Sequence, residues 1–441
     1  MGKYFGTDGF RAEAGVGLTA EHAFKIGRYL GAMLSSGGKS RVVIGKDTRR
    51  SSYMLEYAIT AGLAASGTDV YLLHVTTTPS VAYVVRTEGF DAGVMISASH
   101  NVYSDNGIKL IGNKGEKLGD SVTGEIEAYL DGEREEPPYA TGENIGKTFD
   151  YSAGRNRYIG YLISLATRSF RGKRIGLDCS NGSAWMIARS VFDALGAETY
   201  VISDEPDGLN INRECGSVHT EKLRRLVIDK KLDAGFAFDG DADRCIAVDE
   251  NGREVTGDAI MYIGARYLKK NGMLSKNTVV ATVMSTLGLE ASLEKDGISV
   301  IRTAVGDRFV YEKLMDGGYS LGGEDSGHVV FTKYASAGDG ILTAIKMMEV
   351  MLEEKKTLSE LAKGLLVYPH VMINVPTADQ RGALEREEVK AERARFEKEF
   401  PDYRLILRAS GTEPVVRVYV EGKSEETCNI VAEGFARLIS K

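Results

Sequence analysis

An internal repeat constrains the fold of this chain more than any other feature of its sequence. Two similar runs, Asp-Ala-Gly-Val-Met-Ile at 91–96 and Asp-Ala-Gly-Phe-Ala-Phe at 233–238, each end at a polar tract. Each copy follows an apolar run, a helix-like stretch and a second apolar run: 41–45, 52–67 and 69–73 in the first case, and 174–178, 183–196 and 199–202 in the second. Strand, helix and strand with short connections predict crossover units in mixed or mostly parallel sheets.

A third round and a different C-terminal pattern complete the chain. Apolar runs at 278–282 and 299–302 flank a helical stretch at 286–297, and a further run follows at 319–322. Ser or Thr is expected to begin each of the three helices and Gly to end it. After about residue 367, one charged helix at 381–400 precedes apolar runs at 403–407 and 415–420.

The fold class is therefore predicted to be α/β. We expect three topologically similar α/β domains with mixed sheets and a smaller α+β C-terminal domain. The expected boundaries are 1–150, 151–252, 253–367 and 368–441.

Composition excludes several classes of protein. The 441 residues are 43% hydrophobic and 27% charged, as in ordinary globular proteins, which excludes disorder, collagen and coiled coils. A net charge of −7 argues against a nucleic-acid binder or a protein of anionic membranes, and no apolar run is long enough for a membrane span. The four cysteines are scattered, which favours reduced thiols and a cytoplasmic location.

Ligand sites in such sheets lie in loops beyond the strand ends, which directs attention to the loops after Ile96, Phe238 and Gly322. The first loop is Ser-Ala-Ser-His-Asn at 97–101, with Lys109 eight residues further on. A hydroxyl beside imidazole and ammonium groups suits a nucleophile or a phosphate acceptor. The alternative is an ordinary turn rich in Ser and Asn.

The second loop, Asp-Gly-Asp-Ala-Asp-Arg at 239–244, places three carboxylates on alternate residues. Such crowding of like charge is costly unless a cation neutralises it, and hard oxygen ligands favour Mg²⁺ or Ca²⁺. An EF-hand is the rival interpretation, but Arg244 stands where that loop needs Gly and the flanking residues are typical of strands.

Two further loops carry polar clusters. Gly-Gly-Glu-Asp-Ser-Gly-His at 322–328 is suited to hydrogen bonding a polyol, with a simple hairpin turn as the alternative. In the C-terminal region, Arg-Ala-Ser-Gly-Thr-Glu-Pro at 408–414 precedes a strand carrying Arg417. Guanidinium groups, hydroxyls and Gly-exposed amides indicate a phosphate cradle, and a surface turn is the alternative.

Together these motifs resemble the α-D-phosphohexomutase family, and most closely its bacterial glucosamine branch. The resemblance runs from Tyr-Phe-Gly-Thr-Asp-Gly-Phe-Arg at 4–11 to the tract at 408–414, with one motif in each predicted domain. It implies four domains around a central cleft. It also implies an isomerase that interconverts glucosamine 6-phosphate and glucosamine 1-phosphate on the route to UDP-N-acetylglucosamine.

The resemblance assigns roles to particular residues. Ser99 would be the phosphoserine nucleophile, and its phosphate together with Asp239, Asp241 and Asp243 would bind one Mg²⁺ per chain. The remaining catalytic residues would be Arg11, His100, Lys109, Arg244 and His328, with Lys109 the candidate general base and His328 a second acid/base or positioning residue. The substrate-binding residues would be Glu324, Ser326, Arg408, Ser410, Gly411, Thr412 and Arg417.

The implied cofactors and partners follow from the same resemblance. A sugar 1,6-bisphosphate would serve as intermediate and activator, and a kinase or that bisphosphate would first phosphorylate Ser99. A phosphosugar substrate and a homodimer are expected, with neither nucleic acid nor membrane as partner. A phosphomannomutase/phosphoglucomutase of the same family is the nearest alternative, a sugar-phosphate phosphatase is a second, and a sugar-phosphate or Ca²⁺ sensor is a third.

Four positions depart from the family pattern, and one of them, Ala242, stands among the intact carboxylates where many relatives have Gly. Val102 and Ala409 replace prolines in their loops, which removes rigid φ angles but no functional group. Asp325 stands where the glucosamine branch usually carries Gln. Our hypothesis is that its carboxylate favours the 2-ammonium group of glucosamine phosphate through charge pairing.

Overall fold

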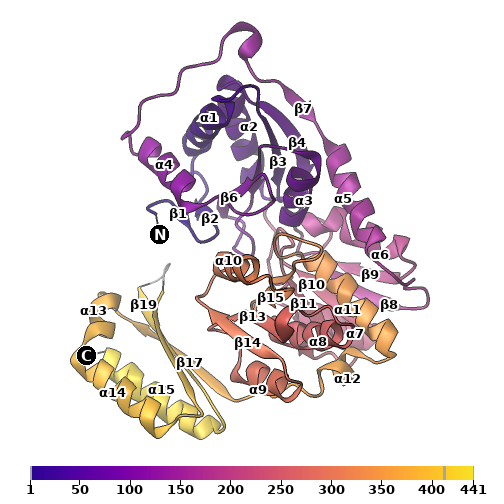
Figure 1. The fold of residues 1–441 in the computed structure, drawn as a ribbon, viewed down its shortest axis with the longest axis vertical. Coiled ribbons are helices and arrows are strands. Elements are labelled where there is room, and N and C mark those ends of the chain that lie inside the picture. Colours follow the sequence, from indigo (N-terminus) through magenta and orange to yellow (C-terminus); the bar gives the residue numbers. More distant parts are fainter. Residues whose placement is uncertain (1, 411–413, 441) are drawn as a thin grey trace. The chain divides into compact units, whose positions relative to one another are not determined.

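The computed structural model describes residues 2–410 and 414–440, and Figure 1 shows its ribbon. The chain forms two compact units. The larger consists of Met1–Met284 with Ile298–Lys363, and the smaller of Ser285–Gly297 with Gly364–Lys441. Every helix in the described part of the chain is too short or too polar to cross a lipid bilayer.

The three sheets of the larger unit share one four-strand topology, as the repeat predicts. The strand orders β6-β5-β3-β4, β11-β10-β8-β9 and β16-β15-β13-β14 correspond position by position. In each sheet the first two strands are antiparallel and the remaining neighbours are parallel. The prediction of three topologically similar mixed sheets is confirmed.

The first sheet extends this topology to seven strands, because a hairpin pairs with β6 and a short strand with β4. Its strands are β1 (Phe5–Gly6), β2 (Gly9–Glu13), β3 (Arg41–Lys46), β4 (Asp69–Val75), β5 (Ala92–Ile96), β6 (Asp105–Gly112) and β7 (Thr148–Asp150). Its helices are α1 (Ala20–Ser35), α2 (Arg50–Ala65), α3 (Thr78–Glu88) and α4 (Asp120–Leu130), with a 3₁₀ turn at Gly142–Asn144.

The second sheet has five strands, of which β12 is a short addition at the edge. Its strands are β8 (Arg174–Asp178), β9 (Glu198–Ile202), β10 (Ala234–Phe238), β11 (Cys245–Val248) and β12 (Glu254–Val255). The associated helices are α5 (Ser152–Ser164), α6 (Ala188–Ala194) and α7 (Glu221–Lys230). The helix predicted at 183–196 is divided, because a 3₁₀ turn at Ser183–Met186 precedes α6.

The third sheet has only the four shared strands. They are β13 (Thr278–Thr282), β14 (Ser299–Thr303), β15 (Leu321–Gly323) and β16 (Val329–Phe331). The neighbouring helices of the larger unit are α8 (Gly257–Lys270), α10 (Asp307–Gly317), α11 (Gly340–Glu354) and α12 (Leu358–Ala362), and a 3₁₀ turn lies at Ser275–Asn277.

The smaller unit contains an antiparallel sheet in the order β17-β19-β18, together with helix α9 (Leu287–Lys295). Its other elements are β17 (His370–Pro376), α13 (Gln380–Glu385), α14 (Glu387–Glu399), β18 (Arg404–Ala409), β19 (Val415–Glu421) and α15 (Glu425–Ile439). The single charged helix predicted at 381–400 is wrong. Arg386 adopts an extended conformation between α13 and α14, and its guanidinium donates to the carbonyls of Leu438 and Ile439.

Helix capping follows the prediction only in part. Thr286 begins α9, and its hydroxyl accepts from the amide of Leu289. Helix α2 instead begins after Arg49, whose side chain makes no capping hydrogen bond. The prediction that Ser or Thr begins each helix is therefore wrong for α2 and for α6, which follows Ile187. Ser52 lies within the first turn of α2, and its hydroxyl donates to Asp47 instead.

The shared topology places the three motif loops at equivalent positions. Each loop joins the antiparallel pair at one side of its sheet: β5 to β6, β10 to β11, and β15 to β16. Glycines let these loops pack closely, because a Cβ added to Gly240 would lie 2.6 Å from the carbonyl oxygen of Ser99. Gly327 likewise faces the backbone of Cys245, whose amide donates to its carbonyl at 3.0 Å.

Glycines also set the close packing of α1 against α2, which lie side by side in Figure 1. A Cβ added to Gly62 would lie 2.2 Å from the carbonyl oxygen of Phe24, and one added to Gly27 would lie 2.4 Å from that of Ile59. Both contacts are to backbone, so a side chain there would force the helices apart.

Gly62→Ala is therefore expected to destabilise the protein by about 1–3 kcal/mol, because overpacking outweighs the better helix propensity of alanine. The control is Gly124→Ala on α4, where no described residue outside that helix's own backbone places an atom within 4 Å of the new Cβ. We expect the control to keep or raise the thermal unfolding midpoint. Equal midpoints for the two variants would contradict the close-packing account.

Candidate active site

Ser99 lies in the first motif loop, between β5 and β6, and is buried. Its backbone has a φ of +53°, which is unfavourable for a residue with a Cβ. Its hydroxyl donates to Oδ2 of Asp239 at 2.5 Å, and Nδ1 of His100 lies 3.4 Å from the Ser99 hydroxyl oxygen. The nucleophile predicted on the first loop is thus in direct contact with the carboxylates predicted on the second.

The carboxylates of Asp239, Asp241 and Asp243 are buried and offer oxygen atoms that all lie within 4.8 Å of one another. Lys109 donates to Oδ2 of Asp241 at 2.7 Å and to Oδ2 of Asp243 at 3.2 Å, and Thr78 also donates to Asp241. The Oδ1 atoms of Asp241 and Asp243 are buried with no hydrogen-bond partner among the described residues. These orphaned oxygens fit a hard divalent cation such as Mg²⁺.

Electrostatics supports the same conclusion. Burial, together with the charges of Asp243 and Asp241, holds the pKa of Asp239 well above the usual range of an aspartate. Burial acts in the same direction on Asp243, but Lys109 and His328 outweigh it and hold the pKa of Asp243 well below the usual range. A divalent cation among the three carboxylates would offset both their repulsion and their burial.

Lys109 and His328, the two acid/base candidates, both contact Asp243. The His328 Nδ1 lies 3.7 Å from Oδ2 of Asp243, and its Nε2 accepts from the amide of Gly338 at 3.1 Å. Burial opposes a charged ring, yet Asp243 and Asp307 raise the pKa of His328 above its usual range. The Gly338 hydrogen bond requires an unprotonated Nε2, so these two features favour opposite protonation states.

Lys109 is held as an ammonium. Burial opposes its charge, but Asp241 and Asp243 outweigh burial and raise the pKa of Lys109. In this state Lys109 is a hydrogen-bond donor and a source of positive charge rather than a base.

Three residues that the sequence analysis did not single out close a ring of charges between Lys109 and His328. Asp8 lies 3.3 Å from Lys109 and also pairs with Lys117, whose ammonium lies 2.6 Å from Asp307. Asp307 in turn lies 3.8 Å from Nε2 of His328. The tract at 4–11 contains Asp8, but only the fold shows that these residues meet.

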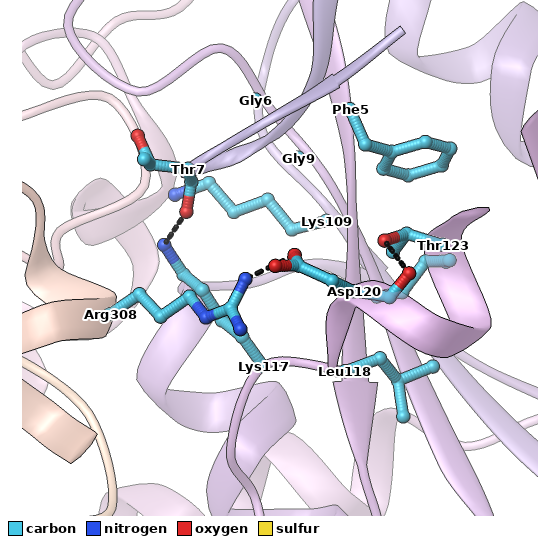
Figure 2. A pocket seen from close by; sticks show the side chains of 11 residues that line it. Phe5, Gly6, Thr7, Gly9, Lys109, Lys117, Leu118, Asp120, Thr123 and Arg308 are labelled. Atoms are coloured by element: carbon cyan, nitrogen blue, oxygen red, sulfur yellow. Dashed lines mark hydrogen bonds and ion pairs between the residues drawn. The ribbon is translucent and has the colours of Figure 1, made fainter. Parts of the chain in front are cut away.

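A polar pocket adjoins this ring and is drawn in Figure 2. Lys117 donates to the carbonyl of Thr7 at 3.3 Å, and Arg308 pairs with Asp120 across the pocket. Lys109 also lines it, so the acid/base candidate lies between this pocket and the carboxylates. On another side, Lys109, Asp243 and His328 line a cavity of about 230 Å³.

Two guanidinium groups lie close to the nucleophile loop. Arg11, on β2, pairs with Asp8, and Arg244 follows Asp243 on the second loop. Burial and the charges of Arg244 and Arg11 lower the pKa of His100 to about 3, so this imidazole is neutral at pH 7. The Nε atoms of both arginines are buried without a hydrogen-bond partner among the described residues. Unused cationic donors of this kind suit a phosphate group.

The polar residues of the third loop differ in exposure and in their hydrogen bonds. Glu324 is partly buried, and its carboxylate accepts from the amide of Gly306 at 3.1 Å. Ser326 is exposed. Asp325 is partly buried, and its carbonyl accepts from the amide of Gly257.

The predicted phosphate cradle belongs to the smaller unit. Arg408 on β18 and Arg417 on β19 are directly opposed cross-strand partners. Two arginines that face each other in this way suit an anion such as a phosphate. Ser410 is buried and its amide donates to the carbonyl of Val415, whereas Gly411 and Thr412 lie outside the described residues.

Comparison with known proteins identifies the family. Models of the phosphoglucomutase/phosphomannomutase family match the chain at 2–137 (α/β/α domain I), 156–252 (α/β/α domain II), 256–368 (α/β/α domain III) and 372–438 (C-terminal domain). The chain is 57% identical to the phosphoglucosamine mutase of Lachnoclostridium phytofermentans, over 98% of this chain and 97% of that protein. The chain belongs to the phosphoglucomutase/phosphomannomutase family. It is also 60% identical to the phosphoglucosamine mutase of Lachnospira eligens, over 97% and 96% of the two chains.

Solved structures of this family share the fold. A phosphoglucomutase/phosphomannomutase family protein from Burkholderia thailandensis superposes with a TM-score of 0.82 at 24% identity, covering 100% of this chain and 98% of that one. An Aspergillus fumigatus N-acetylphosphoglucosamine mutase, solved with GlcNAc-6P and magnesium, superposes with a TM-score of 0.70 at 17% identity, covering 99% and 95%. The α/β architecture predicted from the repeat is thus that of the family's known structures.

Proposed function

We propose that this chain interconverts glucosamine 6-phosphate and glucosamine 1-phosphate through a phosphorylated Ser99 and a sugar 1,6-bisphosphate intermediate. The observation that carries the proposal is the contact between the Ser99 hydroxyl and Asp239, within a buried group of three carboxylates flanked by two arginines with unused donors. Identity of 57–60% to phosphoglucosamine mutases over nearly the whole chain selects glucosamine phosphate as the substrate. The product would feed UDP-N-acetylglucosamine synthesis.

The reaction requires two phosphoryl transfers that share one nucleophile. In the first, the bond between phosphorus and the Ser99 oxygen breaks as a sugar hydroxyl attacks, the hydroxyl loses its proton, and Ser99 regains one. In the second, the Ser99 hydroxyl loses its proton as its oxygen attacks the other phosphorus of the bisphosphate. The bond between that phosphorus and the sugar oxygen breaks, the sugar oxygen gains a proton, and Ser99 is phosphorylated again. Both transfers depend on in-line positioning and charge neutralisation more than on other covalent chemistry.

Carboxylates that hold a cation, and guanidinium groups, would together neutralise the charge of the transferred phosphoryl group. Asp239, Asp241 and Asp243 would hold Mg²⁺, which when bound neutralises charge on the transferred phosphoryl group. The guanidinium groups of Arg11 and Arg244 would contact the same group through their unused donors.

Lys109 and His328 would exchange protons with the sugar hydroxyls, and Lys109, as an ammonium, would act as a proton donor. Both line the same cavity, and both contact Asp243. His100, whose Nδ1 lies 3.4 Å from the Ser99 hydroxyl oxygen, would hydrogen-bond the phosphorylated Ser99.

Substrate recognition is assigned to the two remaining loops. Glu324 and Ser326 would bind sugar hydroxyls. Arg408, Ser410, Gly411, Thr412 and Arg417 would hold the phosphate that is not being transferred, and this cradle must accept either end of the sugar. We also propose domains at 1–150, 151–252, 253–367 and 368–441, a homodimer, a cytoplasmic location, and priming of Ser99 by a kinase or by the bisphosphate.

A phosphomannomutase/phosphoglucomutase remains the alternative within the family. The two functions are separated by kcat/KM on glucosamine, glucose and mannose 6-phosphates, measured with Mg²⁺ and a trace of the matching bisphosphate. The proposal predicts the highest kcat/KM for glucosamine 6-phosphate. Predominant turnover of mannose 6-phosphate would overturn it.

Asp325→Gln tests the origin of this preference. If the carboxylate pairs with the 2-ammonium group, kcat/KM for glucosamine phosphate should fall about fivefold relative to that for glucose phosphate. Glucose phosphate, which has no ammonium group, is the internal control and should be turned over at an unchanged rate. An unchanged ratio would reject charge pairing by Asp325.

A further inference from the structure

Arg49 is fully buried beneath the Ser99 loop, although the proposed chemistry gives it no role. Its Nη2 donates to the carbonyls of Ser99 at 3.0 Å and Asn101 at 2.9 Å. Its Nη1 donates to the carbonyls of Val102 and, at 3.1 Å, of Asp105. Its Nε donates to the carboxylate of Asp47. These contacts together use all five N–H groups of the guanidinium.

One carboxylate connects Arg49 to the other side of the same loop. Oδ2 of Asp47 accepts from Nε of Arg49 at 2.8 Å and from the hydroxyl of Ser97 at 2.7 Å. The hydroxyl oxygen of Ser97 accepts a hydrogen bond from the backbone N–H of Ser99 at 2.9 Å. Both backbone polar groups of Ser99 are therefore tied to Asp47, its carbonyl through Arg49 and its N–H through Ser97.

Asn212, between β9 and α7, holds the same loop from the side of the second sheet. Nδ2 of Asn212 donates to the carbonyls of Ser99 at 2.8 Å and Asn101 at 2.9 Å, which are the two carbonyls that Nη2 of Arg49 contacts. The loop is thus fixed from two directions by amide and guanidinium donors.

These hydrogen bonds surround Ser99, the residue of this loop with a left-handed backbone conformation. Ser99 has a φ of +53°, and such a conformation persists only when its surroundings hold it. In this conformation the Ser99 hydroxyl contacts Asp239 at 2.5 Å. Arginine suits the task because its planar fork can bind four carbonyls and a carboxylate at once, which a lysine ammonium with three donors cannot do.

We propose that Arg49 is a positioning residue for phosphoryl transfer, holding Ser99 in its left-handed conformation through the carbonyls of the 99–105 loop. The inference rests on the proposed function for its effect on turnover. Its structural part, an ordered loop, is independent of that function.

Arg28 provides a matched control for the loss of a buried guanidinium. It is also fully buried in the first α/β region and donates to the carbonyl of Ala65 at 3.1 Å and the hydroxyl of Ser66 at 2.6 Å. Its guanidinium covers the ring of Tyr139 at 3.8 Å. Arg28→Lys therefore disturbs a comparable network that does not include the Ser99 loop.

The test compares Arg49→Lys with Arg28→Lys in the full-length protein by hydrogen exchange and steady-state kinetics. For Arg49→Lys we expect amide exchange in 97–105 to accelerate at least about tenfold, and kcat to fall about 10- to 100-fold with KM changed less than about threefold. For Arg28→Lys we expect exchange in this loop and kcat to stay within about twofold of the wild type, even if its melting temperature falls.

Ser97→Ala is the second variant, for use if Arg49→Lys does not fold. It keeps Arg49 and removes the acceptor of the Ser99 N–H, so it should change loop exchange and kcat in the same direction. Unchanged exchange in 97–105 in the variant tested would overturn the proposal, and so would a kcat loss equal to that of Arg28→Lys. Absence of mutase turnover in the wild type would instead reject the proposed function, while the exchange data would still decide whether Arg49 orders the loop.

Discussion

Ser99→Ala is expected to lower the rate of sugar phosphate isomerisation by about 10³-fold or more, because it removes the atom that carries the phosphoryl group between substrates. The backbone contacts of the loop use the Ser99 carbonyl and N–H, so the variant should fold normally and keep its affinity for the sugar phosphate. Initial rates of glucosamine 1-phosphate formation and binding calorimetry measure the two effects separately.

The matched control is Ser104→Ala, in the same loop. Ser104 is partly buried, and its carbonyl, which the substitution keeps, accepts from the amide of Ala14 at 2.9 Å, so turnover should stay within about twofold of the wild type. Intact-protein mass spectrometry adds a second readout, because the wild type but not Ser99→Ala should gain one phosphoryl group from the sugar bisphosphate. Full activity or full phosphorylation of Ser99→Ala would refute the nucleophile assignment.

Asp241→Asn is expected to lower kcat by about 100-fold or more and to raise the Mg²⁺ concentration needed for half-maximal activity. It replaces one of the three carboxylates proposed as metal ligands, and the Oδ1 of Asp241 is buried without a hydrogen-bond partner among the described residues. The same substitution weakens the contact with Lys109, which is 2.7 Å from Asp241. Activity as a function of Mg²⁺ and direct Mn²⁺ titration by electron paramagnetic resonance measure these effects.

Asp233→Asn is the control for this substitution. Asp233 stands just before β10, whereas the carboxylate loop follows the other end of that strand. Asp233 pairs with Lys173 at 2.9 Å. Its replacement should leave the Mg²⁺ dependence unchanged. Chelation with EDTA should abolish wild-type activity, and Mg²⁺ should restore it. Equal Mg²⁺ dependence for Asp241→Asn and the wild type would contradict the metal site.

The repeat in the sequence was sufficient to predict the architecture of the larger unit. Apolar runs such as 91–96 and 233–238 are buried strands of equivalent topology, and periodicity reports burial directly. The errors arose where one long-range contact decides local structure. Arg386 interrupts the predicted helix through the C-terminal carbonyls of α15, and no pattern near residue 386 signals that contact.

The candidate site was predictable where chemistry is concentrated in one tract. Three alternating carboxylates or a Ser-His pair carry their signal locally. Lys117 and Arg49 do not, because their significance lies in partners distant in sequence: Lys117 pairs with Asp307, and Arg49 binds carbonyls some fifty residues away. A tract such as Asp-Thr-Arg-Arg after an apolar run is equally compatible with a surface turn.

The most direct test of the account is ³¹P NMR of the purified chain with glucosamine 6-phosphate, Mg²⁺ and a trace of glucosamine 1,6-bisphosphate. We predict that the glucosamine 6-phosphate signal is replaced by that of glucosamine 1-phosphate up to equilibrium, with no stoichiometric release of inorganic phosphate. Release of inorganic phosphate equal to the sugar phosphate consumed, or no isomerisation by protein shown to carry phosphorylated Ser99, would contradict the account.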